Sequence, residues 1–319
     1  MNAVSPGNKK NDMKIIAVEP IGISAERAEV IKKELAAKGH EFVWYPDRKE
    51  DPATLAERMK EAEAVIISNI PLSAEVLSQC PKLRFLDVAF TGLDHIDMAY
   101  CQEHGIKVKN ASGYATQAVA ELAVGLAIDV FRKITILDGS IRQGGVRGAF
   151  LGRELHGKTV GIVGTGAIGI RTAQLFQAFG CKVIAWSRTQ KPDVTAMGVT
   201  YVPLDELMRT SDVISLHVPL TAETKHLISK EMLALCKPTA VLINTARGNV
   251  VDMDALAESL REGRLAGAGI DVYEKEPPLT ETHPLLSAPN CVLVPHVGYA
   301  TREAFDIRID IVLGNLSEL

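Results

Sequence analysis

The chain has 319 residues, of which 47% are hydrophobic and 23% are charged, and its 35 basic and 39 acidic side chains leave a formal net charge of −4. This composition is ordinary for a globular protein and excludes a chain that is disordered throughout. The slight acidity excludes the basic face that nucleic-acid binding requires. At about 150 residues per domain, the length predicts two domains.

Neither a membrane-spanning segment nor a secretory signal is expected. The most apolar stretch, 122–128, ends at Asp129, far short of the roughly 20 residues that a bilayer requires. Residues 1–12 have no apolar core, so we expect a disordered lead-in there. Five cysteines stand singly, without a Cys-x-x-Cys pair. This pattern indicates no structural metal site, no disulfide framework and a cytoplasmic location.

In the first third of the chain, short runs of β-branched residues alternate with amphipathic helical segments. Strands are predicted at Lys14–Val18, Glu41–Tyr45, Ala64–Ser68 and Arg84–Ala89. Ser24, Asp51 and Ser73 stand where each can cap a helix between these strands. Strands and helices that alternate at this spacing indicate a parallel sheet with crossover helices.

A long helical segment is predicted from Ala115 to Gln143, where apolar residues recur every three or four positions. It is too long for an ordinary crossover helix and lies near the middle of the chain. We interpret it, with the loop that follows, as the bridge between two domains.

The alternation then restarts, with a helix at Ile168–Phe179 that Gly180 ends. Strands are predicted at Thr159–Val163, Lys182–Trp186, Val213–His217, Ala240–Asn244, Gly267–Val272 and Cys291–Pro295. The sequence therefore predicts an α/β protein of two doubly wound parallel-sheet domains. A cleft between such domains is the usual place for a ligand.

A glycine pattern, Gly164-Thr-Gly166-Ala-Ile-Gly169, lies directly between a predicted strand and a predicted helix. In a dinucleotide-binding turn, the first glycine permits the sharp bend and the second lets the backbone approach a pyrophosphate. The third lets the helix pack closely on the strand. Because both flanks are correct, we predict a dinucleotide site rather than a fortuitous glycine turn.

The residues after the second strand of this unit are Ser187, Arg188 and Thr189, where NAD-binding proteins carry an acid that holds the ribose 2′-hydroxyl. An acid would repel a 2′-phosphate, whereas two hydroxyls and a guanidinium suit one. The pattern predicts a preference for NADPH over NADH. The alternative is that Arg188 is simply solvated in a turn.

Polar residues that packing does not require follow three predicted strands of the second half. Arg247 comes after the strand that ends at Asn244, and His296 comes after the last strand. Asp271 lies at the end of the strand between them, and Glu276 follows it. The carboxyl ends of parallel strands meet at one edge, where ligands bind, so these side chains can converge. Each also has an ordinary explanation, since Arg247 could form an ion pair, Glu276 could lie in a turn and His296 could cap a helix.

In this order and spacing, the motifs from Lys14 onward resemble those of the D-isomer-specific 2-hydroxyacid dehydrogenase family. The motifs that carry the resemblance are Thr91-Gly92-Leu-Asp-His-Ile-Asp97, Val119-Ala-Glu121, Gly164-Thr-Gly166-Ala-Ile-Gly169, Asn244-Thr-Ala-Arg247-Gly248, Asp271-Val-Tyr-Glu-Lys-Glu276-Pro277 and Pro295-His296-Val-Gly298. Within the family, Ser187-Arg188-Thr189 and Gly113-Tyr114-Ala-Thr116 look most like glyoxylate/hydroxypyruvate reductases.

The resemblance implies a Rossmann dinucleotide-binding domain at 111–296 and a flavodoxin-like substrate domain at 13–110 and 297–319. The substrate domain is discontinuous because the last helix of the family returns to it. Leu319 falls within that last predicted helix, earlier than family members commonly end. Members are commonly homodimers, with the bridging helix and the neighbouring loop packed across a two-fold axis, so we expect a homodimer.

The resemblance also implies that Arg247, Glu276 and His296 form the catalytic triad. His296, with an ordinary pKa of about 6.5, would act as general acid and base. Glu276 would bind the far ring nitrogen and favour the imidazolium form. Arg247 would bind the substrate carboxylate and polarise the keto oxygen.

The family match places further contacts with cofactor and substrate. Residues expected to contact the cofactor are Thr116, Gly164, Gly166, Ala167, Ile168, Gly169, Ser187, Arg188, Thr189, Val218, Pro219, Thr224, Thr245, Ala246, Asp271 and Gly298. Among them, Asp271 would accept from the nicotinamide carboxamide. Residues expected to contact the substrate are Asn69, Ile70, Thr91, Gly92, Tyr114, Arg247 and His296. The backbone at Thr91-Gly92 would bind the substrate carboxylate.

We therefore predict an oxidoreductase that reduces small 2-keto acids to D-2-hydroxy acids with NADP, or alternatively NAD. Lactate and branched-chain 2-hydroxyacid dehydrogenases stay open, as does a non-enzymatic, corepressor-like protein that senses a dinucleotide. Formate dehydrogenases of the same fold pair their histidine with glutamine, whereas Glu276 stands here. His217 and His95 have weaker cases, because His217 lacks an orienting carboxylate and His95 is expected at a helix N-terminus.

Overall fold

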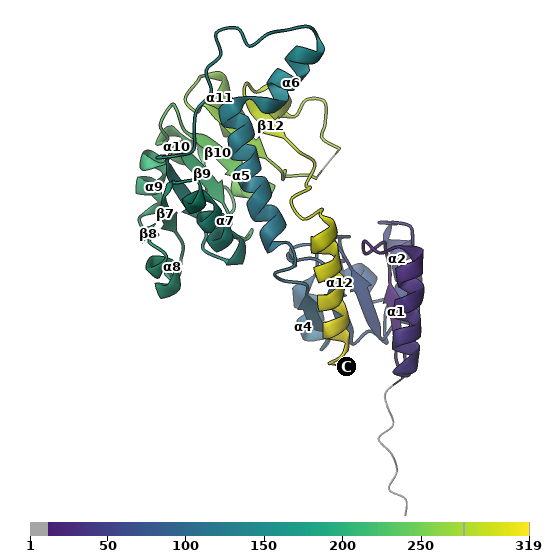
Figure 1. Ribbon diagram of the computed structural model, residues 1–319. Coiled ribbons are helices and arrows are strands. Elements are labelled where there is room, and N and C mark those ends of the chain that lie inside the picture. Colours follow the sequence, from purple (N-terminus) through teal and green to yellow (C-terminus); the bar gives the residue numbers. More distant parts are fainter. Residues whose placement is uncertain (1–11, 277, 319) are drawn as a thin grey trace, which may run out of the picture. The chain divides into compact units, whose positions relative to one another are not determined.

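The computed structural model describes residues 12–276 and 278–318 and divides into two compact units, each visible in Figure 1. Within the described residues, unit 1 comprises 12–114 with 302–318, and unit 2 comprises 115–276 with 278–301. Apart from Asp12, the predicted lead-in at 1–12 lies outside the described residues. Among the described residues, no helix combines the length and the hydropathy that crossing a bilayer demands.

Unit 1 is built on a five-stranded parallel sheet in the order β2-β1-β3-β4-β5, which is the flavodoxin-like order. Its strands are β1 Lys14–Ala17, β2 Glu41–Trp44, β3 Ala64–Ile67, β4 Phe85–Val88 and β5 Lys107–Asn110. Its helices are α1 Ala25–Ala37, α2 Pro52–Met59, α3 Ala74–Leu77, α4 Met98–Glu103 and α12 Arg302–Leu316. β5 is not among the strands predicted from the sequence, because an edge strand that reads Lys-Val-Lys-Asn has little apolar signal.

Helix starts in unit 1 follow from side-chain caps. The Ser24 hydroxyl and the Asp51 carboxylate each accept from the backbone N–H three residues on, as a capping residue does. Ser73 precedes α3 without a side-chain capping bond. Asp97 caps α4, so His95 lies in the turn before that helix rather than at its first turn.

Unit 2 is built on a seven-stranded parallel sheet in the order β12-β11-β10-β9-β6-β7-β8. Its strands are β6 Thr159–Val163, β7 Lys182–Trp186, β8 Thr200–Tyr201, β9 Val213–Leu216, β10 Val241–Asn244, β11 Gly267–Ile270 and β12 Cys291–Leu293. Its α-helices are α5 Thr116–Arg132, α6 Ile134–Arg142, α7 Ala167–Ala178, α8 Pro192–Ala196, α9 Leu204–Thr210, α10 Lys230–Ala234 and α11 Met253–Arg261, with 3₁₀ turns at Gly248–Val250 and Pro284–Ser287. Counted from β6, this is the Rossmann order with one added strand.

The prediction of one helix from Ala115 to Gln143 is wrong, because the chain turns at Lys133 into two helices, α5 and α6. Lys133 adopts a left-handed conformation with φ of 53°, and its N–H binds the Asp129 carbonyl. The Asp129 carboxylate accepts from the Thr135 N–H at 2.9 Å, which starts α6. Both helices are amphipathic, so the apolar period continues across the break and conceals it.

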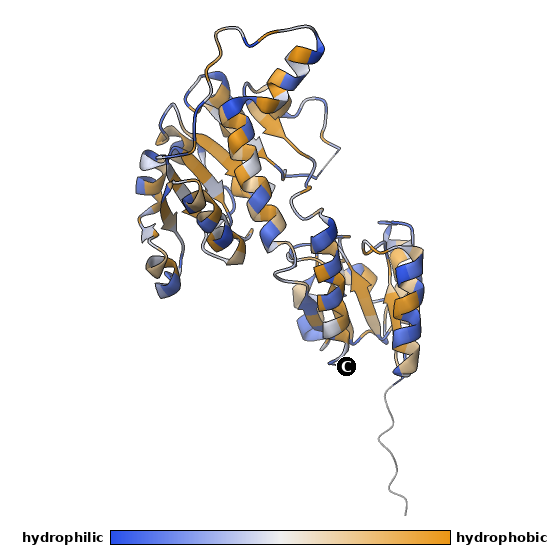
Figure 2. Ribbon diagram, in the orientation of Figure 1, coloured by the Kyte–Doolittle hydropathy of each residue, from blue (hydrophilic) through white to orange (hydrophobic). Residues whose placement is uncertain are grey.

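The sheet of unit 2 is covered by apolar side chains on both faces. Along β9 and β10, Ile214 and Leu242 join the core on one face, while Val213 and Val241 join the core on the other. Figure 2 shows the mainly apolar strands of this sheet and hydrophilic residues along the helices. A sheet buried on both sides holds its carboxyl-end loops on a rigid base.

A buried carboxylate joins the last helix to the sheet of unit 1. Asp87 in β4 is fully buried, and its Oδ1 accepts from Asn315 Nδ2 of α12 at 2.9 Å. Its Oδ2 has no hydrogen-bond partner among the described residues. Burial raises the pKa of Asp87 to about 7, although the Asn315 bond and the charge of Lys109 act in the opposite direction. Asp87 is therefore protonated in the folded protein below neutral pH.

Replacing Asp87 by the isosteric Asn should make the free energy of unfolding less sensitive to pH. In the wild type, the unfolded carboxyl ionises near its ordinary pKa of 3.8 and the folded one only at about 7, so stability falls as pH rises between these values. The loss amounts to at most about 4 kcal/mol. Denaturant titrations across this range should show a flatter profile for Asp87→Asn, and Asp306→Asn on the exposed side of α12 is the control. Equal slopes for Asp87→Asn and wild type would contradict the assignment.

Candidate active site

The glycine turn after β6 has the geometry of a phosphate cradle. Gly164 has φ of 102°, and a Cβ there would lie 2.7 Å from the His217 carbonyl oxygen. A Cβ on Gly169 would lie 2.0 Å from the Gly164 carbonyl oxygen, whereas one on Gly166 would meet nothing within 4 Å. The outer glycines are thus required by packing, and the middle one leaves open space at the start of α7.

That open space suits a pyrophosphate. Gly166 precedes α7 and offers no side chain to cap it, so the N–H groups of the first turn, which begins with Ala167 and Ile168, have no capping side chain. Backbone N–H groups and the positive end of the helix dipole together bind phosphates. The residues present therefore fit a dinucleotide.

Ser187, Arg188 and Thr189 follow β7, beside the glycine turn. The Gly164 N–H donates to the Trp186 carbonyl at 2.7 Å and joins the two strand ends. Ser187 is half-buried, while Arg188 and Thr189 are exposed and accessible to a ligand.

The loop after β9 is held by its own side chains. The buried Thr224 hydroxyl donates to the Pro219 carbonyl at 2.6 Å and accepts from the Thr221 N–H at 2.7 Å, so it closes the loop. Val218 is buried. Directly after β9, His217 Nε2 lies 2.8 Å from the Ser215 hydroxyl, and burial lowers the pKa of His217 to about 3. His217 is therefore neutral and is not a proton donor at physiological pH.

Arg247 stands at the carboxyl end of β10 on a segment that is bonded from within. Asn244 accepts from the Ala246 N–H at 3.0 Å and donates to the Arg247 carbonyl at 3.0 Å. The Arg247 guanidinium donates to the Ala246 carbonyl at 2.8 Å. The buried Thr245 hydroxyl has no hydrogen-bond partner among the described residues, which leaves it available to a ligand.

Gly248 brings this segment against the loop after β11. A Cβ on Gly248 would lie 1.9 Å from the carbonyl carbon of Tyr273. Only glycine permits that approach, so the segment that carries Arg247 packs against the loop that leads to Glu276.

His296 and Glu276 come together at the carboxyl ends of β11 and β12. His296 Nδ1 lies 3.2 Å from Glu276 Oε1, and the two side chains are 16% and 47% exposed. His296 has φ of 54°, a left-handed conformation that is uncommon for a residue with a side chain. Residues in such strained conformations concentrate at functional sites, where the surrounding structure imposes them.

Buried groups impose the His296 conformation from both sides. Asp271 is 1% exposed, and its two carboxylate oxygens accept from the Val297 and Gly298 N–H groups at 2.6 and 3.0 Å. The buried Tyr273 hydroxyl donates to the Val294 carbonyl at 3.0 Å. Burial raises the pKa of Asp271, although the two N–H groups and the charge of His296 act in the opposite direction.

Some residues that were expected to contact the cofactor or the substrate lie away from His296 and Glu276 in the chain. Thr116 is the half-buried first residue of α5. Asp271 uses both oxygens on the backbone, so its binding of a carboxamide stays a prediction. The five unit 1 residues expected to contact substrate lie on loops after β3, β4 and β5 and are Asn69, Ile70, Thr91, Gly92 and Tyr114. Ile70 and Tyr114 are buried, while Thr91 is exposed.

Sequence reasoning missed several residues that hold these loops. Tyr273 lies within a quoted motif, but no role was predicted for it. Glu19 and Arg48 contact the segment after β3 and belong to no motif. A carboxylate directly after the first strand of an α/β unit was the available signal for Glu19. In the described part of the chain, no group of three or more His, Cys, Asp or Glu side chains could hold a metal ion.

A Rossmann sheet with an open phosphate cradle, together with a histidine–carboxylate pair and an arginine at its carboxyl edge, defines a dinucleotide-dependent oxidoreductase. The sequence profile of the D-isomer specific 2-hydroxyacid dehydrogenase NAD-binding domain matches residues 124–298. The chain belongs to the D-isomer-specific 2-hydroxyacid dehydrogenase family. It is an oxidoreductase that acts on a CH–OH group and uses a nicotinamide dinucleotide.

The similar proteins include glyoxylate reductases and an imino acid reductase. The glyoxylate reductase of Thermococcus litoralis is 41% identical over 290 residues, which cover 88% of this chain and 87% of that protein. A crystal structure of a glyoxylate reductase from Paecilomyes thermophila is 31% identical and has a TM-score of 0.86, covering 96% and 95% of the two chains. An acyclic imino acid reductase in complex with NADPH and D-Arg is 30% identical, with a TM-score of 0.86 and 96% of each chain covered. The predicted family and fold class are confirmed.

The glycine turn yields a paired test that separates folding from ligand binding. Gly169→Ala should lower the melting temperature by several degrees, because its Cβ would lie 2.0 Å from the Gly164 carbonyl oxygen. Gly166→Ala should leave the melting temperature nearly unchanged, since its Cβ meets no protein atom within 4 Å. It should nevertheless weaken dinucleotide binding at least tenfold, measured by fluorescence titration. Wild-type dinucleotide affinity in Gly166→Ala would show that the phosphates do not lie there.

Proposed function

We propose that the protein is a glyoxylate/hydroxypyruvate-type reductase that converts small 2-keto acids to D-2-hydroxy acids. The observation that carries this proposal is the His296–Glu276 pair, 3.2 Å apart at the carboxyl edge of the dinucleotide-binding sheet. Unit 2 then acts as the dinucleotide-binding domain and unit 1 as the substrate domain. The identity with glyoxylate reductases over most of the chain supports the choice of substrate.

His296 supplies the proton in the proposed reaction. A reduced nicotinamide dinucleotide, when bound, would supply the hydride for the keto carbon, and the keto oxygen needs a proton as its π bond breaks. The Nε2–H of His296 donates that proton, and in the reverse direction Nε2 accepts it. Glu276 accepts from Nδ1–H, which orients the ring and stabilises the imidazolium form. The bonds from Asp271 and Tyr273 to the flanking backbone keep the ring in place before substrate arrives.

Arg247 is the electrostatic partner of the substrate. Its guanidinium pairs with the substrate carboxylate and polarises the keto oxygen, which stabilises the charge that develops there. Within unit 1, the backbone N–H groups at Thr91-Gly92 can also bind a substrate carboxylate. Asp271 would accept from the carboxamide of a bound dinucleotide through its remaining lone pairs, and Thr245 would take part in binding the ribose.

The preferred coenzyme is NADPH. Ser187, Arg188 and Thr189 offer two hydroxyls and a cation where NAD-binding enzymes place an acid, and Arg188 is exposed. Glu223 lies close enough for the positive charge of Arg188 to contribute to its lowered pKa, after the larger effect of the Thr221 hydroxyl. The imino acid reductase of similar fold was solved with NADPH.

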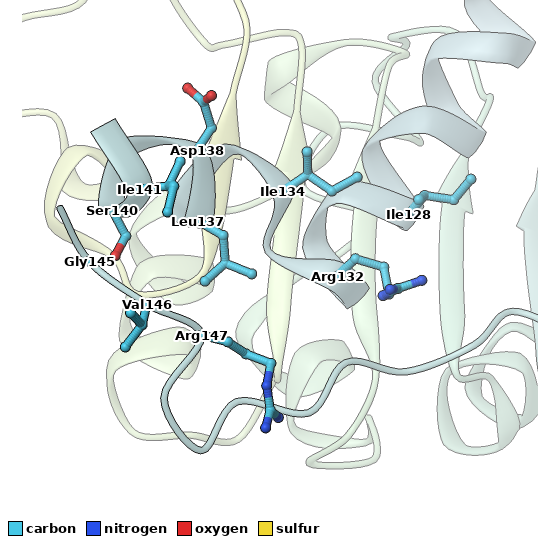
Figure 3. A pocket seen from close by; sticks show the side chains of 10 residues that line it. All are labelled: Ile128, Arg132, Ile134, Leu137, Asp138, Ser140, Ile141, Gly145, Val146 and Arg147. Carbon is cyan, nitrogen blue, oxygen red and sulfur yellow. The ribbon is translucent and has the colours of Figure 1, made fainter. Parts of the chain in front are cut away.

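A second copy of this chain covers the exposed apolar face of α6. Every residue of α6 is at least partly exposed, and its Ile134 and Ile141 are 52% and 64% exposed. Val146, in the loop that follows α6, is 81% exposed. These side chains and Leu137 line a hollow beside α6 (Figure 3). An apolar face of this kind marks an interaction surface, and a homodimer is the most common solution.

His296→Gln should reduce kcat on glyoxylate by about 10²–10⁴-fold, because the proton donor is lost. Coenzyme affinity should stay close to that of the wild type, since the phosphate cradle is unchanged. His104→Gln, at an exposed histidine that stacks on Tyr100, is the control and should be fully active. Near-native turnover in His296→Gln would refute the assigned role. Wild-type inactivity on all keto acids with intact coenzyme binding would instead support a dinucleotide-sensing protein.

Arg188→Ala should raise the KM for NADPH at least tenfold and leave the KM for NADH nearly unchanged, because only NADPH carries the 2′-phosphate. Initial rates with each coenzyme at saturating glyoxylate measure both constants. Arg209→Ala is a matched control at an exposed arginine on α9. Equal effects on both coenzymes would mean that Arg188 does not contact the phosphate.

Ile141→Glu should convert the dimer to a monomer, because it places a charge on the covered face. Sedimentation velocity at micromolar concentration distinguishes the two masses. A monomeric wild type would refute the proposed dimer.

A further inference from the structure

A buried carboxylate in unit 1 holds the segment 68–70 after β3. Glu19 lies just beyond the end of β1 and is 1% exposed. Its Oε1 accepts from the Ser68 N–H at 2.7 Å and from the Ile70 N–H at 3.4 Å. The Asn69 N–H also stabilises the charged form of Glu19, as does Arg48, whereas burial raises its pKa. Three consecutive N–H groups thus surround one anion.

Arg48, from the loop after β2, completes this cluster. Its Nη1 lies 2.7 Å from Glu19 Oε2 and also donates to Asn69 Oδ1 at 2.7 Å. Its Nε donates to Glu50 at 2.7 Å, so the guanidinium is held from both ends. Arg48 is 39% exposed and Asn69 is half-buried, so both stand at the surface of the carboxyl edge.

The contact with Arg48 decides how the Asn69 amide is oriented. A guanidinium only donates hydrogen bonds, so the amide oxygen must face Arg48. The amide NH₂ group then points away from Arg48. In the described part of the chain, no hydrogen bond engages this group. It is a donor available to a ligand at the edge where β3 and β4 end.

The neighbouring loop is the one proposed to bind the substrate carboxylate. β3 and β4 are adjacent and in register from Ala64–Phe85 to Ile67–Val88. The Ser68 hydroxyl donates to the Ala89 carbonyl at 3.3 Å, and the Ala89 N–H donates to Ile67 at 2.7 Å. The segment with Asn69 therefore lies directly beside the segment that leads to Thr91-Gly92.

We propose that Glu19 and Arg48 are positioning residues that direct the Asn69 NH₂ group at the substrate, so that the site selects 2-keto acids with a hydroxyl on the carbon next to the keto group. This inference rests on the proposed function. A hydroxyl oxygen accepts the Asn69 N–H, whereas a methyl group in its place leaves a donor without a partner. Sites built to bind a hydroxyl discriminate strongly against analogues without one. Glyoxylate has no such carbon and therefore forms no bond of this kind with Asn69.

The test is the ratio of kcat/KM for hydroxypyruvate to that for pyruvate, with glyoxylate as the internal reference. In the wild type, kcat/KM for hydroxypyruvate should exceed that for pyruvate by more than about tenfold. Asn69→Leu should lower the ratio at least tenfold, because activity on hydroxypyruvate falls further than activity on pyruvate or glyoxylate. The change should fall mainly on KM if Asn69 binds the hydroxyl equally in the ground and transition states.

Arg48 variants separate positioning from general stability. Arg48→Met should lower the ratio as Asn69→Leu does, because the amide is then free to turn. Arg48→Lys keeps a donor for both Glu19 and Asn69 and should retain most of the ratio. Arg84→Met is the control, because Arg84 forms an exposed ion pair with Glu63 at 3.0 Å at the start of β4 and lies at the opposite edge. Melting temperatures of all variants identify any that fail to fold.

The outcomes are distinct. A ratio unchanged by Asn69→Leu, or an equal loss on all three acids, would overturn this inference and leave the proposed function standing if glyoxylate is still reduced. A wild type that reduces none of the three acids would overturn the proposed function and this inference together.

Discussion

The candidate site depends on one interaction, the bonds from two backbone N–H groups to the buried Asp271 carboxylate. These bonds hold the turn after β12 and fix Val297 and Gly298 directly beside His296, which has a left-handed backbone conformation. This turn also places His296 Nδ1 3.2 Å from Glu276 Oε1. An unconstrained turn would leave the imidazole free to rotate away from its carboxylate.

The two units use the same physical device for different purposes. In each, a buried carboxylate just beyond a strand accepts consecutive N–H groups from the loop of another strand. Asp271 does so in unit 2 and Glu19 does so in unit 1. A buried anion must be compensated, and backbone N–H groups compensate it without adding another side chain. The compensated loops are the ones that carry His296 and Asn69.

Glycine and strand order explain why the chemistry gathers at one edge of unit 2. The Rossmann order places the ends of β6, β9, β10, β11 and β12 along a single edge. Gly164 and Gly169 bring α7 onto this edge, and Gly248 brings the Arg247 segment against the Tyr273 loop. Each glycine removes a side chain that would separate two backbones. The open phosphate cradle and the packed arginine segment are therefore consequences of the same residue type.

The sequence by itself determined the two α/β units, the dinucleotide turn and the order of Arg247, Glu276 and His296, because glycine spacing and strand ends are local signals. Only the tertiary structure decided the break at Lys133, the edge strand β5 and the contacts of Glu19 and Arg48. The apolar period passes unchanged through Lys133, and β5 has a polar sequence that only its pairing with β4 makes a strand. Contacts such as Arg48 with Asn69, or Asp87 with Asn315, join residues 21 or 228 positions apart. Such pairs have no local pattern, since their chemistry arises only when folding brings them together.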